Sequence, residues 1–108
     1  MHDTPISIPA AFRATAAQYP DLPLVWRPQA PASFAEVDRA SDRVAAALAR
    51  GGIQPGDRVA LYCINDLSFV QAYLGIQKAG GVVVPVNLLI GSEEITYILN
   101  DAGVRALI

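Results

Sequence analysis

The sequence is poor in the residues that build disulfides and metal sites. Among its 108 residues there is one cysteine, Cys63, and one histidine, His2. A single cysteine cannot form an internal disulfide, and one cysteine with one histidine cannot supply the four ligands that zinc usually takes. Cys63 lies in an apolar stretch, residues 59–64, so we interpret it as a buried thiol without chemistry. We expect no metal site in this chain.

Membrane, secretion and nucleic-acid signals are also lacking. No stretch approaches the roughly 20 apolar residues of a membrane span, and the first five residues show no charged-then-apolar secretion signal. The formal net charge is −2 and the lysine and arginine residues do not cluster, so the chain has no electrostatic footprint for DNA or RNA. These observations predict a cytoplasmic location and no nucleic-acid partner.

What the sequence does contain is an alternation of strand and helix patterns. That order is typical of an α/β fold, with a mainly parallel sheet and helices on its faces. At 108 residues the chain has room for one domain, so residues 1–108 are expected to form a single α/β unit, with residues 1–6 as a mobile tail. The expected strands are residues 22–26, 58–64, 82–86 and 104–108, and the expected helices are residues 7–19, 33–51, 66–80 and 92–103.

The segment from residue 76 to residue 87 joins a helix end, a strand and a loop. Gly80 and Gly81 can take the left-handed conformation that ends a helix. Residues 82–86 are rich in valine, which predicts a strand covered on both faces. Pro85 lacks an N–H group and is therefore expected at the strand end or at a bulge.

The helix that begins at Ser33 carries an explicit start signal. Ser33 and Glu36 have the spacing of a capping box, in which each side chain accepts a hydrogen bond from the other residue's N–H group. The charged residues of this helix are interpreted as a solvated face, with a docking patch as the functional alternative. The expected buried stripe is Val37, Ala40, Val44, Ala47 and Leu48, and the expected solvated face is Asp38, Arg39, Asp42 and Arg43.

The next two helices differ in polarity. The helix capped by Asn65 or Asp66 is apolar around most of its circumference, with a narrow polar stripe at Ser68, Gln71, Gly75 and Lys78. Such a helix is covered on several sides, either by one sheet or by further parts of a larger protein. In the second case the isolated chain would expose apolar surface and could dimerise. The last helix is expected to have Ser92 as its N-cap.

Two loops are candidate ligand sites, because open parallel sheets bind ligands beyond the carboxyl ends of their strands. They place Asn65 and Asn87 on the ligand side. Each asparagine has a plainer interpretation, Asn65 as a helix cap and Asn87 as a turn residue that bonds to its own backbone. The two double-glycine pairs follow helices, which argues against a dinucleotide loop.

Three segments in the right order resemble the adenylate-forming (AMP-binding) superfamily, which includes acyl-CoA synthetases and the adenylation domains of peptide synthetases. Residues 78–87, Lys-Ala-Gly-Gly-Val-Val-Val-Pro-Val-Asn, resemble a core motif of that superfamily. Residues 33–48 resemble its opening helix, and residues 54–61 resemble its turn into the following strand. Cys63-Ile64, where a proline is common, and Gly81, where alanine is more frequent, depart from the pattern and put the subfamily in question.

The resemblance covers nearly the whole chain from Ile8 onward but only the opening part of such an enzyme's large domain. It implies a parent enzyme that uses ATP and Mg²⁺ to convert a carboxylic acid, expected to be a fatty acid, into an acyl-adenylate. The enzyme then transfers the acyl group to coenzyme A. The family's phosphate loop, Mg²⁺-binding acidic motif, ribose-binding aspartate and catalytic lysine have no counterpart in residues 1–108. The resemblance therefore implies no catalytic or cofactor-binding residue in this chain, a supporting role for it, and inactivity in isolation.

A rival interpretation is a free-standing α/β module that works by binding another protein. The apolar strand at residues 104–108 ends abruptly, which favours missing sequence over a complete module. The coding frame distinguishes the two, because continuation into a Gly/Ser/Thr-rich loop supports the ligase and a stop codon supports the module.

Overall fold

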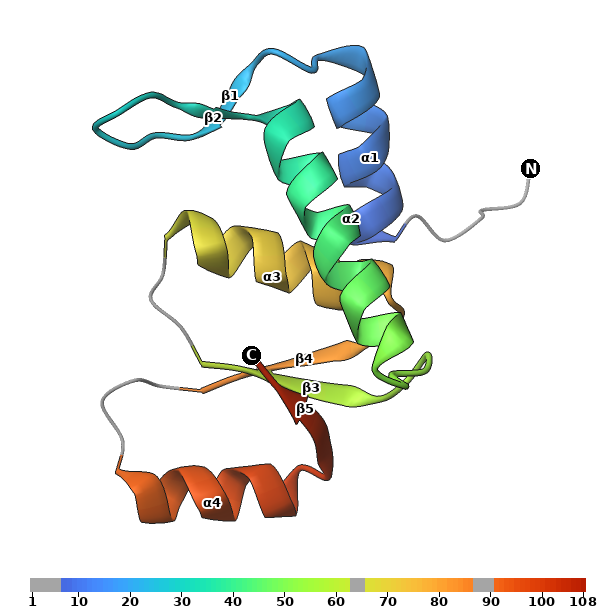
Figure 1. The fold of residues 1–108 in the computed structure, drawn as a ribbon, viewed down its shortest axis with the longest axis vertical. Coiled ribbons are helices and arrows are strands. Elements are labelled where there is room, and N and C mark those ends of the chain that lie inside the picture. The colour runs from blue at the N-terminus through green and yellow to red at the C-terminus, as the bar shows by residue number, and fades with distance from the viewer. Residues whose placement is uncertain (1–6, 63–65, 87–90) are drawn as a thin grey trace, which may run out of the picture.

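The computed structural model of the chain describes residues 7–62, 66–86 and 91–108 (Figure 1). From residue 58 onward strands and helices alternate, which confirms the predicted α/β class. The predicted tail, His2 and Cys63 lie outside the described residues. The elements are α1 Ile8–Gln18, β1 Pro23–Val25, β2 Ala32–Ser33, α2 Phe34–Arg50, β3 Arg58–Leu61, α3 Leu67–Lys78, β4 Val82–Pro85, α4 Ser92–Asp101 and β5 Val104–Leu107.

The main sheet has three parallel strands in the order β4-β3-β5. Arg58 pairs with Val82 on one side and with Val104 on the other, so the three strands start at the same edge. In Figure 1, α3 lies on one side of this sheet and α4 lies on the other. The sheet is therefore wound in both directions from its central strand, β3, as in open α/β folds.

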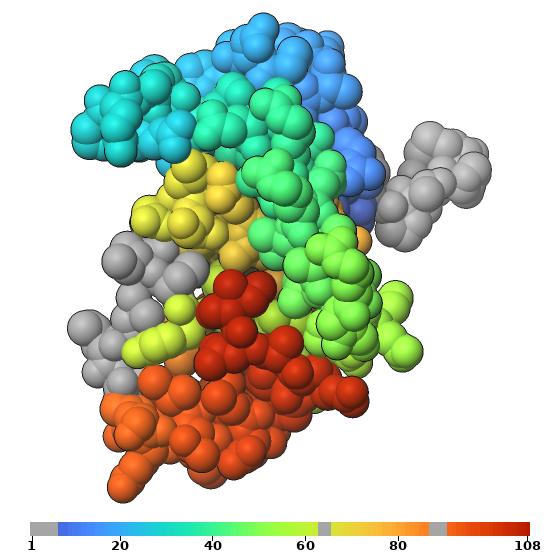
Figure 2. Space-filling view, in the orientation of Figure 1, coloured from blue at the N-terminus to red at the C-terminus, as the bar shows by residue number. Residues whose placement is uncertain are grey.

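The expected strand at residues 22–26 does not belong to the main sheet, which is a correction to the simple alternating pattern. It forms β1, which pairs with the two-residue β2 in an antiparallel ribbon. A short connector can join antiparallel strands, whereas a parallel pair needs a crossover of a dozen or more residues. The Pro-rich connector at residues 26–31 makes this return, and it projects from the body of the molecule (Figure 2).

Helix α2 begins with one half of the predicted capping box. The Ser33 hydroxyl accepts a hydrogen bond from the Glu36 N–H group at 3.1 Å. The Glu36 carboxylate does not return the bond among the described residues, because it accepts from the Arg27 guanidinium at 3.1 Å instead. Arg27 lies in the connector, so the β1–β2 ribbon supplied a partner that local spacing could not predict.

Helix α3 is the centre of the structure. On one side its Ala72 and Ile76 pack with Val59 and Leu61 of β3. On another side its Leu74 packs with Val37 of α2 and Ala32 of β2. This confirms that α3 is covered on several sides, and it shows that β3, α2 and the ribbon supply the cover.

Four finer predictions were wrong. Val82 of β4 is 48% exposed, so β4 is not covered on both faces along its whole length. The N-cap of α4 is Gly91, which has no side chain to accept a bond, and Ser92 is the first helical residue. Ala47 of α2 is exposed. Strand β3 ends at Leu61, so Tyr62 is not part of it, contrary to the predicted strand 58–64. Pro85, by contrast, is the last residue of β4, as predicted.

Two turns meet at the edge of the sheet where the strands start. The turn at Pro55-Gly56 has the positive φ of a type II turn, 89° at Gly56, and the helix end at Gly80 has φ 83°. The Gly56 N–H donates to the Gly80 carbonyl at 2.9 Å, and the Val82 N–H donates to the Asp57 carbonyl at 2.8 Å. The turn before β3 and the turn before β4 are therefore hydrogen-bonded to each other.

Candidate functional site

The carboxyl edge of the sheet is the first candidate, because ligands in open α/β folds bind there, at the point where neighbouring strands connect to opposite sides. In this sheet the chain leaves β3 toward α3 on one side and leaves β4 toward α4 on the other (Figure 1). The Tyr62 N–H, just beyond β3, donates to the Ile108 carbonyl at 2.8 Å. On the other side of β3, the Val86 N–H donates to the Leu61 carbonyl at 2.9 Å. These backbone bonds hold the three strand ends level.

The two asparagines predicted at this edge, Asn65 and Asn87, both lie outside the described residues. The topology nevertheless separates their positions in the chain. Asn65 follows β3, the central strand, whereas Asn87 follows β4, one of the two outer strands. The cap of α3 is Asp66, whose carboxylate accepts from the N–H groups of Ser68 at 3.0 Å and Phe69 at 3.4 Å. This settles the alternative between Asn65 and Asp66 for the cap.

A groove of about 510 Å³ lies where the connector of the ribbon passes the start of α3. Trp26, 75% exposed, and Pro28 form part of one wall, and Asp66 and Leu67 form part of the other. Asp66 already occupies two of the free N–H groups at the helix start, so the groove does not offer them to an anion. The sequence did not predict this groove, because the ribbon that forms it depends on the unpredicted strand β2.

A cluster of charged side chains joins the three helices α1, α2 and α3. The Lys78 ammonium of α3 donates to the Asp38 carboxylate at 2.6 Å, to the Asp38 carbonyl at 3.0 Å and to the Asp42 carboxylate at 2.8 Å. The Arg13 guanidinium of α1 donates to the same Asp42 oxygen at 2.7 Å. The side chain of Lys78 is only 4% exposed.

This cluster corrects the interpretation of α2 as having a simply solvated charged face. Asp38 and Asp42 do lie on that face, but they are the partners of a buried lysine. The Phe12 ring of α1 covers the ammonium, with its centroid 5.6 Å from the Lys78 nitrogen. The i, i+4 spacing of Asp38 and Asp42 was a usable signal, because it places two carboxylates side by side on a helix.

The cluster also sets the charge state of Asp42. The hydrogen bond from Lys78 lowers the pKa of the Asp42 carboxyl, and the charges of Lys78 and Arg13 lower it further. Partial burial raises the pKa of Asp42, but the net effect is a lowered pKa. Asp42 is therefore held as a carboxylate.

The chemistry available to this cluster is limited, because the hydrogen-bond donors of Lys78 are already bonded to the two aspartates. An ammonium has three donors, and those of Lys78 have three acceptors within 3.0 Å. An amine in that state is neither a nucleophile nor a free cation for a phosphate. Over residues 7–62, 66–86 and 91–108, no three His, Cys, Asp or Glu side chains come together in a way that could hold a metal ion. Within the same ranges, no helix combines the length and apolar character needed to cross a bilayer.

The fold and the sequence together place the chain in a known class. The sequence model of the family described as "AMP-binding enzyme" matches residues 12–108, and the chain belongs to that family. This confirms the resemblance drawn from the sequence.

Relatives within the family include several kinds of enzyme. The chain is 37% identical over 103 residues to a long-chain-fatty-acid–CoA ligase of Salmonella typhimurium, covering 94% of this chain and 18% of that protein. It is 34% identical over 97 residues to a linear gramicidin synthase of Brevibacillus parabrevis, covering 90% of this chain and 2% of that protein. Among solved structures, the Mycobacterium tuberculosis fatty acyl CoA synthetase superimposes with a TM-score of 0.87 at 31% identity, covering 93% of this chain and 20% of that chain.

The chain therefore spans about a fifth or less of the length of each of these relatives. It also matches 26% of a structure of the N-terminal domain of FACL13 from Mycobacterium tuberculosis, with a TM-score of 0.87. The architecture described above is thus the architecture of one part of the N-terminal domain of acyl-CoA synthetases.

Proposed function

We propose that this chain is the N-terminal part of an ATP-dependent acid–thiol ligase that activates a fatty acid as an acyl-adenylate and transfers it to coenzyme A. The observation that carries the proposal is the family match over residues 12–108 together with the similarity to a long-chain-fatty-acid–CoA ligase at 37% identity. A cytoplasmic location accompanies this proposal and stays a prediction.

The fatty-acid assignment rests on which relatives match and how well. The ligase of Salmonella typhimurium is matched over 94% of the chain. A fatty acid–[acyl-carrier-protein] ligase of Streptomyces coeruleorubidus is matched at 35% identity over 92 residues. The linear gramicidin synthase shows that a similar segment also occurs outside the fatty-acid ligases. A fatty acid is thus the favoured substrate class, and coenzyme A is the favoured acceptor.

We also propose that the described residues do not bind ATP or Mg²⁺. Stabilising charge on a transferring phosphoryl group requires free cationic donors or a metal. Lys78 is fully engaged, the start of α3 is capped by Asp66, and the described residues hold no metal-ligating cluster. We therefore assign no catalytic step to these residues, and we propose that the chain alone is inactive.

The role we propose for this segment is to support the large domain. Helix α3 buries residues against both β3 and α2, which makes a packed layer on one face of the sheet. The strand ends at that edge are held level by the bonds at Tyr62 and Val86. Such a layer would position loops that form part of the wall of an acyl pocket, while Mg²⁺, ATP and coenzyme A bind to the remainder of the enzyme.

The test is ATP–pyrophosphate exchange with a panel of fatty and aromatic acids. It should be run on the 108-residue chain and on a protein extended by any coding sequence that continues past Ile108. We expect no exchange from the chain and exchange with fatty acids from the extended protein.

Each other result has a definite meaning. Exchange by the 108-residue chain would refute its proposed inactivity. Exchange with aromatic but not fatty acids would keep the ligase and replace the substrate class. An extended, folded protein that exchanges with none of the acids would refute the ligase and favour the protein-binding module.

A further inference from the structure

Helix α1 is attached to the rest of the structure in an unusual way. Only one of its residues, Ala16, is buried, and Ile8 is 59% exposed. Its apolar anchor is Phe12, which stacks on Phe34 with ring centroids 5.9 Å apart. Its charged anchor is the bond from Arg13 to Asp42 at 2.7 Å. Phe12 also packs against the buried cluster that contains Leu74, so the described anchors of α1 are Phe12, Arg13 and the buried Ala16.

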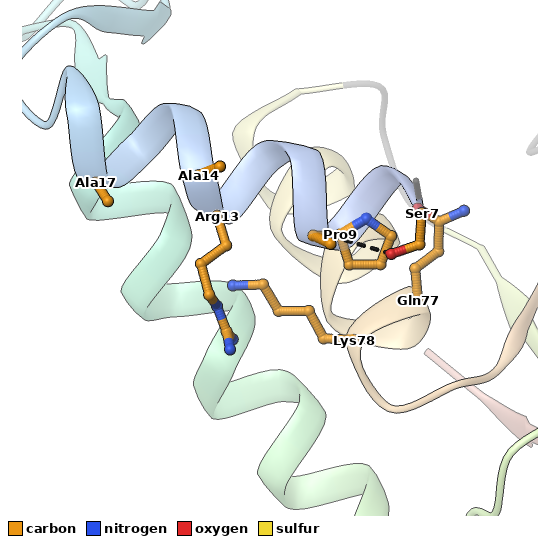
Figure 3. Close-up of a pocket in the computed structure, with 8 residues that line it drawn as sticks. Ser7, Pro9, Arg13, Ala14, Ala17, Gln77 and Lys78 are labelled. Atoms are coloured by element: carbon orange, nitrogen blue, oxygen red, sulfur yellow. Dashed lines mark hydrogen bonds between the residues drawn. The ribbon is translucent and has the colours of Figure 1, made fainter. Parts of the chain in front are cut away.

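The packing beside α1 is incomplete. A groove of about 560 Å³ runs between α1 and the end of α3, lined on one side by Pro9, Arg13 and Ala17 and on the other by Gln77 and Lys78 (Figure 3). Among the described residues the side-chain amide oxygen of Gln77, Oε1, is buried without a hydrogen-bond partner. Unfilled space and an unsatisfied polar atom both weaken the docked arrangement.

Immediately after α1 the backbone becomes hydrogen-bonded to the start of α2. Beyond Pro20 the backbone is tied to the start of α2, because the Ala35 N–H donates to the Pro20 carbonyl at 3.0 Å and the Phe34 N–H donates to the Leu22 carbonyl at 2.9 Å. Pro20 also cannot continue a helix. These two hydrogen bonds place the end of the segment that is bonded to α2 at Pro20. Helix α1 precedes that point, so its detachment would not break either bond.

We infer that α1 is a detachable lid over a buried lysine: it opens as a unit about residues 19–20 and uncovers Lys78 and the seam between α2 and α3. In the closed state the Phe12 ring and Arg13 cover the Lys78 and Asp42 pair. In the open state Asp38 and Asp42 of α2 remain beside Lys78, but water reaches the amine and can replace these bonds, which leaves the amine free to react. Opening of α1 therefore exposes the lysine without breaking the α2–α3 contact.

The sequence offers a direct probe of this lid, because Lys78 is its only lysine. Amine-reactive reagents can modify only Lys78 and the amino terminus, so the amino terminus serves as an internal reference. Labelling of Lys78, measured by mass spectrometry, reports how often the lid is open. Hydrogen exchange at the amides of α1 and α3 reports opening independently of chemistry at the amine.

The wild-type chain should exchange its α1 amides at least about tenfold faster than the amides of the α3 interior, since the lid opens without global unfolding. Asp42→Asn removes the bond from Arg13 and should speed α1 exchange by up to about fivefold while leaving exchange in the α3 interior unchanged. The matched control is Asp101→Asn, which removes the same charge from the exposed end of α4 and should change neither rate.

A second variant protects the test against a misfolded Asp42→Asn protein. Phe12→Ala removes the apolar anchor while leaving every charged group in place, and it should speed α1 exchange more than tenfold. If α1 and α3 amides exchange in step in the wild type and in both variants, the two helices form one cooperative unit and the lid does not exist. If Lys78 is labelled only as fast as α3 exchanges, the lid is likewise refuted.

Discussion

Helices α3 and α4 are of similar length and each connects two strands of the same sheet, yet they are packed very differently. Helix α3 buries four residues, and α4 buries none. The difference follows from their neighbours, because α3 lies between the sheet and α2, whereas the described contacts of α4 are mainly with β5. Helix α4 has an apolar stripe of Ile95, Ile98 and Leu99, but it is only half-buried. An amphipathic pattern therefore shows which face a helix can bury, and the neighbours decide how much of it is buried.

The largest expected effect comes from truncating the same residue type in the two helices. Ile76→Ala in α3 removes a fully buried side chain and should lower the free energy of unfolding by about 3 kcal/mol. Ile98→Ala in α4 removes a half-buried side chain and should cost about 1 kcal/mol. Urea denaturation of both variants measures the difference. Equal losses would mean that α4 is as well packed as α3, contrary to the comparison.

The next effect concerns the close approach of α3 to α2. A Cβ atom at Gly75 would lie 2.5 Å from Val44, so Gly75→Ala must push the helices apart. The overpacking cost of about 1–3 kcal/mol is offset by a gain in helix propensity of about 1 kcal/mol, which leaves a net loss of up to about 2 kcal/mol.

The matched control for this change is Gly51→Ala at the end of α2. There the added Cβ would meet its neighbours at 3.4 Å and 3.5 Å, and φ is −79°, so no loss is expected. Thermal unfolding of both variants decides the point. A Gly75→Ala protein as stable as the wild type would show that the α2–α3 contact adapts without strain.

A smaller effect separates the starts of the two helices. Asp66→Ala removes the carboxylate that accepts two N–H groups at the start of α3, and it should cost about 1 kcal/mol. Ser92→Ala should change stability by less than about 0.5 kcal/mol, because the N-cap of α4 is Gly91. A comparable loss in both variants, measured by chemical denaturation, would restore Ser92 as a cap.

The smallest expected effect is a dependence on pH. The pKa of Asp42 is lowered in the folded chain, so its contribution to stability is present above its usual value of 3.8 and is lost as pH falls through the lower folded value. Both Asp42 and Arg13 are substantially exposed, so the contribution should be below about 1 kcal/mol. Asp42→Asn should therefore reduce the loss of stability between about pH 5 and pH 3. An unchanged pH profile would show that Asp42 carries no net stabilisation.

Features that depend on neighbours in the sequence were predictable. The bond from Glu36 to Ser33, the turn at Gly56, the helix end at Gly80 and the position of Pro85 each follow from the conformational limits of one or two residues. Features that depend on distant partners were not. Pairing of β1 with β2, and the exposure of Val82, are decided by which segments meet in space.

The same division applies to the candidate sites. The carboxyl edge of the sheet could be located from strand order, although Asn65 and Asn87 themselves lie outside the described residues. The cluster at Lys78 could not be assembled from the sequence, because its partners are 36 and 40 residues away. The hydrogen bond from Arg27 to Glu36 was likewise not predictable, because it depends on the conformation of the connector.

The hydrogen-bonded turns at Gly56 and Gly80 help to fix the register in which β4 pairs with β3. Shifting β4 along β3 by one residue would turn Val83 away from the core cluster that it packs against, and it would also break the bond between the two turns. An added Cβ at Gly80 would meet Pro55 at 3.1 Å, so the two turns are also close-packed. Misaligned pairing of these neighbouring strands is thus opposed at their starting points as well as along their length.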